Sequence, residues 1–358
     1  MDTKREEGVE VVKHASSHRF GLHIRILLRC RDFWTGVTVI PTFVLVLMVL
    51  MVFGLVMETR SIACVAEVPV LFKEETCSPK VADPNTIKYY SGHRYYSSLK
   101  EMDAPLPAPT FRGKHTELCE EDLRRKVKYS YCLPISGRKD TPFCTAGDRI
   151  DLLNVNSHES VCYASVLHML LVEVYEELEA SGNTPLIMFG SLLGAVRNGS
   201  MIPFTEDTDI GFVGRLQAKE ELQEELWQKG YHMFFMGVWR VCVAPTHPLA
   251  SKLYDPTLPI ARNFAVPYVD LYMTKKLKNG NWDIEELQGS NGRLLPSNKV
   301  EPFSQVTING MPFNTVRDPH FFLKEAYGPN YMTPKPRRKP APKPKSTTAA
   351  KNTTKTTK

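Results

Sequence analysis

The chain has 358 residues, of which 42% are hydrophobic and 23% are charged, and its formal net charge is +6. This length accommodates one or two domains with appendages. The positive charge is concentrated at the ends: residues 334–358 hold nine Lys or Arg and no acid, and residues 1–35 hold seven against five acids. The segment between them is mildly acidic, at about −5, which argues against nucleic acid as its main partner.

Residues 36–57 carry no charged side chain, and from Phe43 to Val56 they are almost entirely apolar. Such a stretch spans the hydrocarbon core of a bilayer, whereas a cleaved signal peptide has a shorter apolar core nearer the N-terminus. Basic residues precede it, namely Arg19, Arg25, Arg29 and Arg31. The positive-inside rule therefore predicts a transmembrane signal anchor at 36–57, with a cytosolic tail of residues 1–35 and a lumenal remainder.

Seven of the eight cysteines follow the predicted anchor, in a compartment where disulfides form: Cys64, Cys77, Cys119, Cys132, Cys144, Cys162 and Cys242. Their spacing matches no zinc-binding pattern. The odd count leaves one thiol free or paired with another chain, and Cys64 could link two copies in a homodimer. Residues 58–155 are punctuated by proline and lack sustained periodicity. They predict a cysteine-containing lumenal stem, with a small separate domain as the alternative.

The character of the sequence changes after Ser157. Apolar residues recur there at three- and four-residue spacing as far as Leu178, which predicts an amphipathic helix ended by Gly182. Residues 185–189 are a short apolar run and predict a buried strand. A short helix is predicted at residues 192–197, directly after a Gly-Ser turn.

Asp207 and Asp209 lie on an extended segment beyond this helix. Because side chains alternate along a strand, the two carboxylates project to one side and Glu206 to the other. Adjacent carboxylates repel each other, and a divalent cation relieves that repulsion. The turn at Gly190 and Ser191 offers backbone N–H groups to a phosphate. Metal ligands beside a phosphate site indicate phosphoryl transfer, whereas a solvated turn is the alternative for an isolated Asp-x-Asp.

The rest of the chain predicts further helices and strands. Asp270 lies in the middle of one predicted strand, where aspartate is disfavoured. Asn309-Gly310 is typical of a tight hairpin turn, and Asp318-Pro319 is typical of a helix start. The predicted elements are a helix at 218–229, paired strands at 231–235 and 238–243, a strand at 266–274, a hairpin at 306–313 and a helix at 320–327.

The order of strand, Gly-Ser turn, helix, loop and Asp-x-Asp strand resembles the LicD/fukutin-related family of the nucleotidyltransferase superfamily. The family motif reads roughly G-[ST]-L-L-G-x-x-R and then I-P-W-D-x-D-x-D. This chain matches it at Gly190, Ser191, Leu192, Leu193, Gly194, Arg197, Ile202, Pro203, Asp207 and Asp209. Phe204 replaces the usual tryptophan, and Thr205 replaces the first aspartate. Residues 269–272 and 327–334 resemble two further family segments.

The resemblance implies an α/β (α+β) fold, a nucleotidyltransferase-like mixed sheet flanked by helices, as the catalytic domain at residues 156–334. It also implies that a later strand supplies a third carboxylate, Asp270, although a partnered structural aspartate is the alternative. The implied ligands of one or two Mg²⁺ or Mn²⁺ ions are Asp207, Asp209 and Asp270. The implied phosphate contacts are Gly190, Ser191 and Arg197, with a helix-surface ion pair as the alternative for Arg197.

The activity that the resemblance implies is transfer of a phosphorylated alcohol, such as phosphocholine or ribitol phosphate, from a CDP-linked donor to a glycan hydroxyl. One of the three aspartates would accept the hydroxyl proton. The implied setting is a single-pass type II protein of the Golgi or endoplasmic reticulum membrane. Two alternatives stay open: an Asp-x-Asp glycosyltransferase that uses a nucleotide-sugar, and a non-catalytic relative that regulates a partner enzyme.

The C-terminal residues 335–358 form a Lys/Pro/Thr-rich tail of low complexity that is predicted to be disordered. Two glycosylation sequons begin at Asn198 and Asn352. We expect modification at Asn352, in the accessible tail. Little is expected at Asn198, because a glycan in the motif loop would lie beside the predicted phosphate site.

Overall fold

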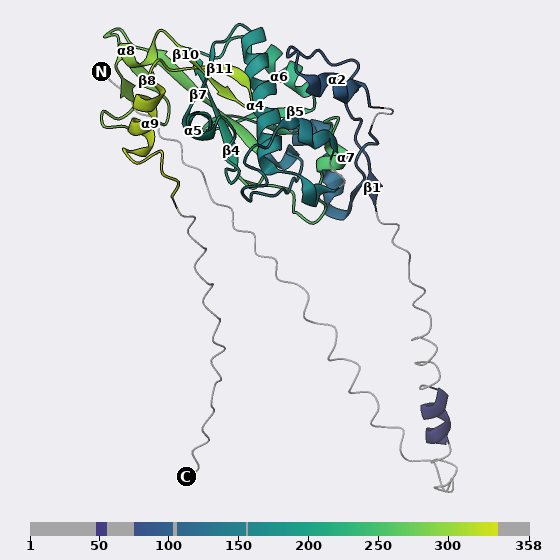
Figure 1. The fold of residues 1–358 in the computed structure, drawn as a ribbon. Helices are drawn as coiled ribbons and strands as arrows, with labels where there is room; N and C mark the ends of the chain where they lie inside the picture. Colours follow the sequence, from purple (N-terminus) through teal and green to yellow (C-terminus); the bar gives the residue numbers. More distant parts are fainter. Residues whose placement is uncertain (1–47, 56–74, 103–105, 155–156, 336–358) are drawn as a thin grey trace, which may run out of the picture. The chain divides into compact units, whose positions relative to one another are not determined.

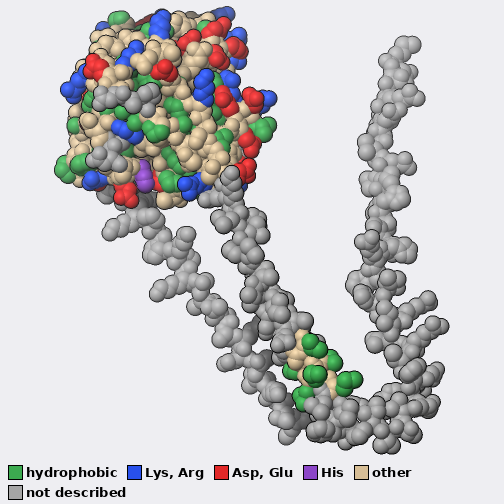
Figure 2. All heavy atoms as spheres, turned by 90° about the vertical axis from the view of Figure 1, so that its right-hand side faces the viewer, with side chains coloured by type: hydrophobic (Ala, Val, Ile, Leu, Met, Phe, Trp, Pro, Cys, Tyr) green, Lys and Arg blue, Asp and Glu red, His purple; other side chains and the backbone are tan. Residues whose placement is uncertain are grey.

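The computed structural model describes residues 48–55, 75–102, 106–154 and 157–335 (Figure 1). The chain divides into two units, Met1–Phe72 and Lys73–Lys358. In the first unit residues 48–55 are helical, and their large apolar side chains are exposed (Figure 2). No helix within these described ranges is both long and apolar enough to cross a membrane.

Several features predicted from the sequence fall on other parts of the chain. The cytosolic tail at 1–35, most of the anchor at 36–57, Cys64 and Asn352 lie outside the described residues. These predictions are therefore not addressed by the structure.

The second unit is built on a mixed sheet. In the part of the chain that the structure describes, its seven strands are β3 (Pro185–Ile187), β4 (Asp207–Val213), β5 (Tyr231–Met236), β6 (Val238–Val243), β7 (Tyr268–Lys276), β8 (Trp282–Ile284) and β9 (Leu294–Leu295). The order is β3-β4-β7-β6-β5, with β8 beside β7 and β9 beside β8. β4 and β7 run parallel, and the other neighbours are antiparallel. This arrangement confirms the predicted mixed sheet.

Helices flank this sheet, as predicted (Figure 1). The main ones are α4 (Tyr163–Ala180), α5 (Phe189–Asn198), α6 (Lys219–Gln228) and α9 (Pro319–Tyr327). Shorter elements follow β6 and β9, namely α7 (Ala250–Leu253), α8 (Ser297–Val300) and the hairpin β10 (Ser304–Ile308) and β11 (Met311–Thr315). The hairpin turns at Asn309 and Gly310, which both have positive φ, as a two-residue turn of this type requires.

The helix α4 is buried on nearly all sides rather than on one face. All residues from Tyr163 to Val174 are buried, although the sequence pattern predicts an amphipathic helix. One side packs against β4, β6 and β7. The other side is covered by the segment that precedes it, because Tyr95 donates a hydrogen bond to the sulfur of Met169 and buried Arg149 lies 3.7 Å from Glu173.

Residues 75–154 therefore belong to the compact unit and do not form a separate stem. Their elements are β1 (Thr76–Cys77), α2 (Arg94–Lys100), β2 (Phe111–Arg112), α3 (Glu121–Arg124) and the 3-10 helices η1 (Gly113–Cys119), η2 (Lys128–Tyr131) and η3 (Arg149–Asn154), with η4 (His158–Ser160) following. Their apolar side chains share one core with α4 and the sheet, among them Tyr95, Leu99, Phe111, Leu118 and Leu133. The predicted stem is part of this core because the apolar residues on the outer side of α4 would otherwise be exposed to water.

Disulfides fasten this segment to the rest of the unit. The pairs are Cys77–Cys119, Cys132–Cys242 and Cys144–Cys162. The second bond joins the residue after η2 to β6 across 110 residues of chain. Every cysteine among the described residues is thus paired, and Cys64 is the remaining cysteine on the C-terminal side of the predicted anchor.

We expect the fragment 157–335 to fail to fold cooperatively, because it exposes the outer side of α4 and leaves Cys162 and Cys242 without partners. Fragment 75–335 is the matched control and should show a single cooperative thermal transition by circular dichroism. A cooperative transition of fragment 157–335 at the same temperature would contradict the shared core.

Candidate active site

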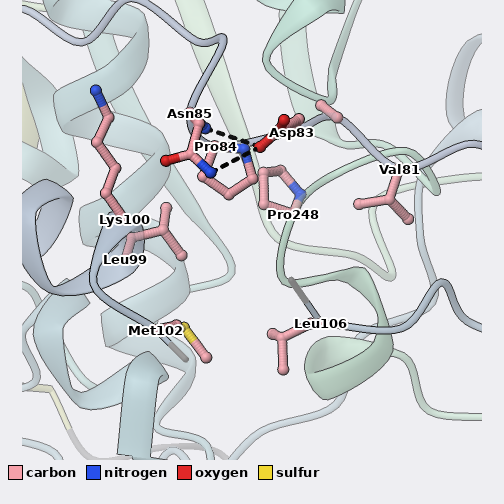
Figure 3. Close-up of a pocket in the computed structure, with 10 residues that line it drawn as sticks. Val81, Asp83, Pro84, Asn85, Leu99, Lys100, Met102, Leu106 and Pro248 are labelled. Carbon is pink, nitrogen blue, oxygen red and sulfur yellow. Dashed lines mark hydrogen bonds between the residues drawn. The ribbon is translucent and has the colours of Figure 1, made fainter. Parts of the chain in front are cut away.

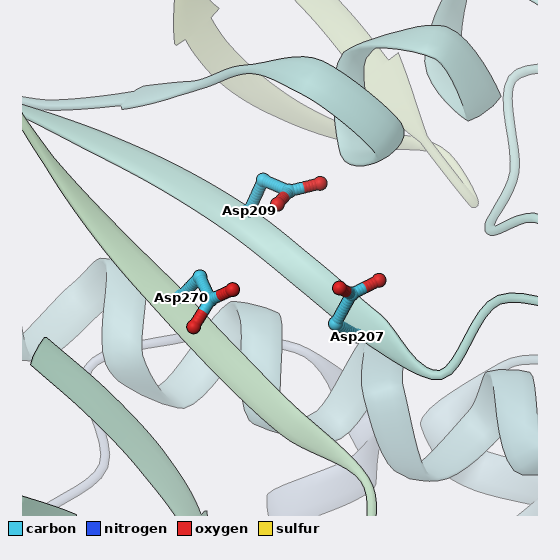
Figure 4. A group of neighbouring side chains, drawn as sticks. All are labelled: Asp207, Asp209 and Asp270. Carbon is cyan, nitrogen blue, oxygen red and sulfur yellow. The ribbon is translucent and has the colours of Figure 1, made fainter. Parts of the chain in front are cut away.

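Three aspartates converge on one face of the sheet (Figure 4). Asp207 and Asp209 belong to β4, and Asp270 belongs to β7. The two strands are parallel neighbours, and Asp209 lies directly opposite Asp270 in their register. One carboxylate oxygen from each residue lies within 4.8 Å of the others. The structure thus places the predicted pair side by side and brings the predicted third carboxylate next to it.

Alternation along the strands explains why these side chains share a face. Ile210, Val269 and Leu271 are buried in the core that contains α4. Their neighbours in sequence must project to the opposite face. Asp209 and Asp270 are each 5% exposed, so the carboxylates lie in a hollow and not on an open surface.

The start of α5 is held against Asp209. The backbone N–H of Gly190 donates a hydrogen bond of 2.7 Å to Oδ2 of Asp209. A Cβ atom at residue 190 would lie 2.9 Å from that oxygen, so any larger residue would displace the carboxylate of Asp209. The preceding Phe189 has a left-handed φ of 41°, which is strained for a bulky residue. Its ring packs between Tyr272 and Phe322, and this packing fixes the direction in which α5 begins.

Two predicted phosphate contacts have other partners in the structure. The Ser191 hydroxyl is 2.6 Å from the Thr208 hydroxyl and accepts a 2.7 Å hydrogen bond from the backbone N–H of Asp209. The guanidinium of Arg197 donates to the backbone carbonyl of Tyr331. Both side chains thus brace the fold around the aspartates.

The sequon at Asn198 lies away from the aspartates. Asn198 is the last residue of α5, which begins beside Asp209 and ends at Gly199 in the left-handed conformation. A helix of ten residues is about 15 Å long. Asn198 and Gly190, which contacts Asp209, therefore lie near opposite ends of α5, and low modification of Asn198 stays a prediction.

Hydroxyl groups hold the carboxylates in place. Thr205, which replaces the first aspartate of the family motif, donates a hydrogen bond of 3.0 Å to Oδ1 of Asp207. The Tyr268 hydroxyl donates a hydrogen bond of 3.3 Å to Oδ2 of Asp207, and the Tyr272 hydroxyl donates one of 3.1 Å to Oδ2 of Asp270. Burial, with the nearby carboxylates, raises the pKa of both tyrosines well above the usual range. Both phenols therefore stay protonated and act as donors.

Arg240 is part of the site, and the sequence analysis did not include it. Its Nε lies 2.7 Å from Oδ1 of Asp270. The signal that could have found it is the one that marks Asp270, a charged residue in the middle of an apolar strand. Asp270 is thus both a potential metal ligand and the partner of a buried cation.

Asp207 and Asp209 open onto a pocket of about 580 Å³, a size suited to a small-molecule ligand. Asp207, Asp209 and Gly190 line it. Aromatic side chains form much of the remaining wall: Phe189, Phe204, Tyr268, Tyr272 and Tyr327. Glu206, predicted to project to the other side of the strand, precedes β4; it is exposed and lines the pocket.

A second pocket of about 260 Å³ lies between residues 81–85, the end of α2 and Pro248 (Figure 3). Its charged lining side chains are Asp83 and Lys100. Asp83 accepts hydrogen bonds from the backbone and side chain of Asn85. This pocket offers no cluster of metal ligands, so the pocket at the aspartates is the candidate active site.

Comparison with known families agrees with this geometry. Residues 182–315 match the family described as "LicD/FKTN/FKRP, nucleotidyltransferase domain", and this range contains all three aspartates. The chain carries a LicD-family nucleotidyltransferase domain. This family suggests a transferase of the phospho-alcohol kind. The LicD match starts after α4, so the helix and its cover lie outside the matched residues.

Other comparisons add little to the LicD match. No match to this chain was found among curated proteins. A solved structure titled "Crystal Structure of ANT(2")-Ia in complex with adenylyl-2"-tobramycin" is 14% identical and covers 44% of this chain and 70% of its own, with a TM-score of 0.28. Similarity at this level does not bear on the function of the LicD domain.

The aspartates of the LicD domain fit a divalent cation. Burial, followed by the charges of Asp207 and Asp270, raises the pKa of Asp209 well above its usual range. Burial also raises the pKa of Asp270 to about 6, although Arg240 acts in the opposite direction. Both shifts show that negative charge is destabilised here, and a divalent cation would offset it. Carboxylate oxygens are the ligands that Mg²⁺ and Mn²⁺ prefer.

We expect Mn²⁺ binding by the LicD domain to weaken as the pH falls below about 6, because Asp209 and Asp270 have raised pKa values and take up protons that compete with the ion. The dissociation constant should rise by about tenfold per pH unit for each proton displaced. Calorimetric titration between pH 5 and 7 measures this dependence. Asp270→Asn should give a shallower dependence, and a constant affinity over this range would contradict the expectation.

Proposed function

We propose that this chain is a metal-dependent transferase that moves a phosphorylated alcohol, such as phosphocholine or ribitol phosphate, from a CDP-activated donor to a glycan hydroxyl. The observation that carries the proposal is the convergence of Asp207, Asp209 and Asp270 within a LicD-family domain. Phosphoryl transfer depends mainly on positioning and on stabilising negative charge. Three fixed carboxylates beside a pocket of suitable size meet both needs.

The three aspartates would hold Mg²⁺ or Mn²⁺, which when bound supplies positive charge to the donor diphosphate and the departing CMP. The chain keeps its carboxylates in position: Gly190 fixes Asp209, and Thr205 and Tyr268 fix Asp207. The exposed ring of Phe204 offers a flat surface to the cytosine base.

The reaction is a displacement at phosphorus. The acceptor oxygen forms a bond to the transferred phosphorus, and the bond from that phosphorus to the CMP oxygen breaks. The electron pair leaves with CMP, and a carboxylate of the site takes the hydroxyl proton. The buried position of Asp209 and Asp270 keeps bulk water away from these two carboxylates.

We further propose a lumenal setting in the Golgi or endoplasmic reticulum, with residues 36–57 as a type II signal anchor. The three disulfides of the second unit support an oxidising compartment. Because the six described cysteines pair with one another, Cys64 is the thiol through which a disulfide-linked homodimer would form.

Two other functions lead to different outcomes. A glycosyltransferase would use the aspartates to hold a nucleotide-sugar and would transfer the sugar. A non-catalytic relative is favoured by the pairing of Asp270 with Arg240 and by Thr205 in place of an aspartate. Turnover of a panel of CDP-alcohols and nucleotide-sugars with Mg²⁺ or Mn²⁺ separates the three, because the non-catalytic relative would turn over none.

We expect Asp207→Asn and Asp209→Asn each to lower donor turnover by about a thousandfold, since loss of a charged ligand removes several kcal/mol of transition-state stabilisation. Thermal stability should be unchanged, because each substitution removes one of several mutually repelling carboxylates. Asp283→Asn is the matched control: it lies on β8 in an exposed pair with Arg293 and should keep parental activity. Near-parental activity of Asp209→Asn would contradict the assignment.

We expect added protease to remove only the N-terminal tail at 1–35 when it acts on intact microsomes, since residues 58–358 are proposed to be lumenal. Glycopeptide mass spectrometry should also find a glycan at Asn352. Digestion of the LicD domain in sealed microsomes, together with an unmodified Asn352, would reverse the proposed topology.

A further inference from the structure

A buried arginine is built into the carboxylate cluster. Arg240 is the third residue of β6 and is only 8% exposed. In the antiparallel pairing of β6 with β7 it lies directly opposite Asp270, and its Nε is 2.7 Å from Oδ1 of that residue. The backbone register of two central strands therefore fixes a positive charge beside the aspartates, whether or not an ion is bound.

The surroundings of Arg240 keep its guanidinium in this position. The Cζ atom of Arg240 lies 5.0 Å from the ring centre of Phe264 and 5.8 Å from that of Tyr268. Its Nη1 group donates a hydrogen bond to the backbone carbonyl of Met236. Phe264 and Tyr268 in turn pack against the ring of Tyr129, which belongs to the segment of residues 75–154 that precedes α4. Arg240 is thus nearly buried, with its guanidinium next to two aromatic rings and Asp270.

The net charge of the cluster matches the charge of one divalent cation. When ionised, Asp207, Asp209 and Asp270 carry three negative charges, and Arg240 compensates one of them. The two that remain equal the charge of a single divalent ion. Of the other acids that line the pocket, Glu206 is paired with Lys139 at 3.2 Å and Glu286 is exposed, so neither adds an uncompensated buried charge.

The contacts of Asp270 also count against a second ion that shares this carboxylate. In a two-metal site the ions lie about 3.5–4 Å apart, close enough for one carboxylate to contact both. Asp270 has Arg240 at Oδ1 and accepts the Tyr272 hydroxyl at Oδ2. With one protein cation or donor on each oxygen, Asp270 retains capacity for one ion but is poorly suited to bridge two.

We infer that Arg240 takes the place of a second metal ion, so that this site binds one divalent cation, and that Arg240 positions Asp270 for it. The inference rests on the metal site of the proposed function. It does not depend on which group is transferred, and it assigns Arg240 the role of a positioning residue.

The test counts bound Mn²⁺ on the full-length chain in detergent, by electron paramagnetic resonance of the free ion, with and without CDP. The parent should bind one Mn²⁺ per chain in both conditions, and Asp207→Asn should lose it. Two ions per parental chain would overturn the inference while leaving the metal site intact. No bound ion would overturn the metal site itself, and the two failures are therefore distinguishable.

Substitutions of Arg240 test its role directly. Arg240→Met removes the compensating charge and should raise the count from one to two ions, whereas Arg240→Lys keeps the charge and should bind one. The matched control is Arg293→Met, which removes an arginine from an exposed Arg–Asp pair of the same sheet and should bind one ion. A folded Arg240→Met that binds one ion with parental affinity, or an Arg240→Lys that binds two, would contradict the inference. The parental count does not depend on whether either variant folds.

Discussion

The parallel pairing of β4 with β7 is the constraint on which the site depends. Two strands distant in sequence are brought into a register that sets Asp209 opposite Asp270. The same register buries Ile210 and Leu271 on the other face. Because the side-chain period of a strand is two, a slip of one residue would bury the carboxylates in the core and expose the apolar side chains. Packing against α4 and placement of the aspartates are therefore set by one interaction.

The same register creates an electrostatic cost, and the surrounding structure offsets it. Three carboxylates in a low-dielectric environment repel one another, which favours their protonated forms. The N–H of Gly190 and the hydroxyls of Thr205, Tyr268 and Tyr272 donate hydrogen bonds to the carboxylates, and the guanidinium of Arg240 forms an ion pair with Asp270. These groups fix carboxylate directions before any ion binds, which is the preorganisation that charge stabilisation in catalysis requires.

The sequence predicts the parts of this molecule that depend on local pattern. The strands predicted at 185–189 and 266–274 correspond to β3 and β7, and the predicted hairpin at Asn309-Gly310 corresponds to β10 and β11. The helix predicted at 192–197 corresponds to α5, but α5 begins at Phe189, so Gly190 and Ser191 are part of the helix and not a turn before it. The shared side of Asp207 and Asp209 follows from strand alternation alone. Asp270 could be singled out because a charge in mid-strand is unusual.

What the sequence did not predict depends on contacts between distant segments. Ser191 and Arg197 contact Thr208 and the carbonyl of Tyr331, and no local pattern indicates these contacts. The described residues between 75 and 154 lack sustained periodicity because their apolar side chains enter the core singly. The role of that segment depends on α4, which is buried on nearly all sides and is therefore covered by both the sheet and this segment.

Residues of the segment 75–154 also contact side chains that line the pocket. Lys139 precedes the LicD match and lies 3.2 Å from Glu206, which lines the pocket. The disulfide Cys144–Cys162 and the hydrogen bonds between Arg138 and residues 161 and 163 fix the position of this lysine. Tyr129 likewise packs on Tyr268, the donor to Asp207. Since the matched domain supplies the carboxylates and the preceding segment supplies part of their surroundings, differences in substrate among such proteins can arise in residues that the family motif does not include.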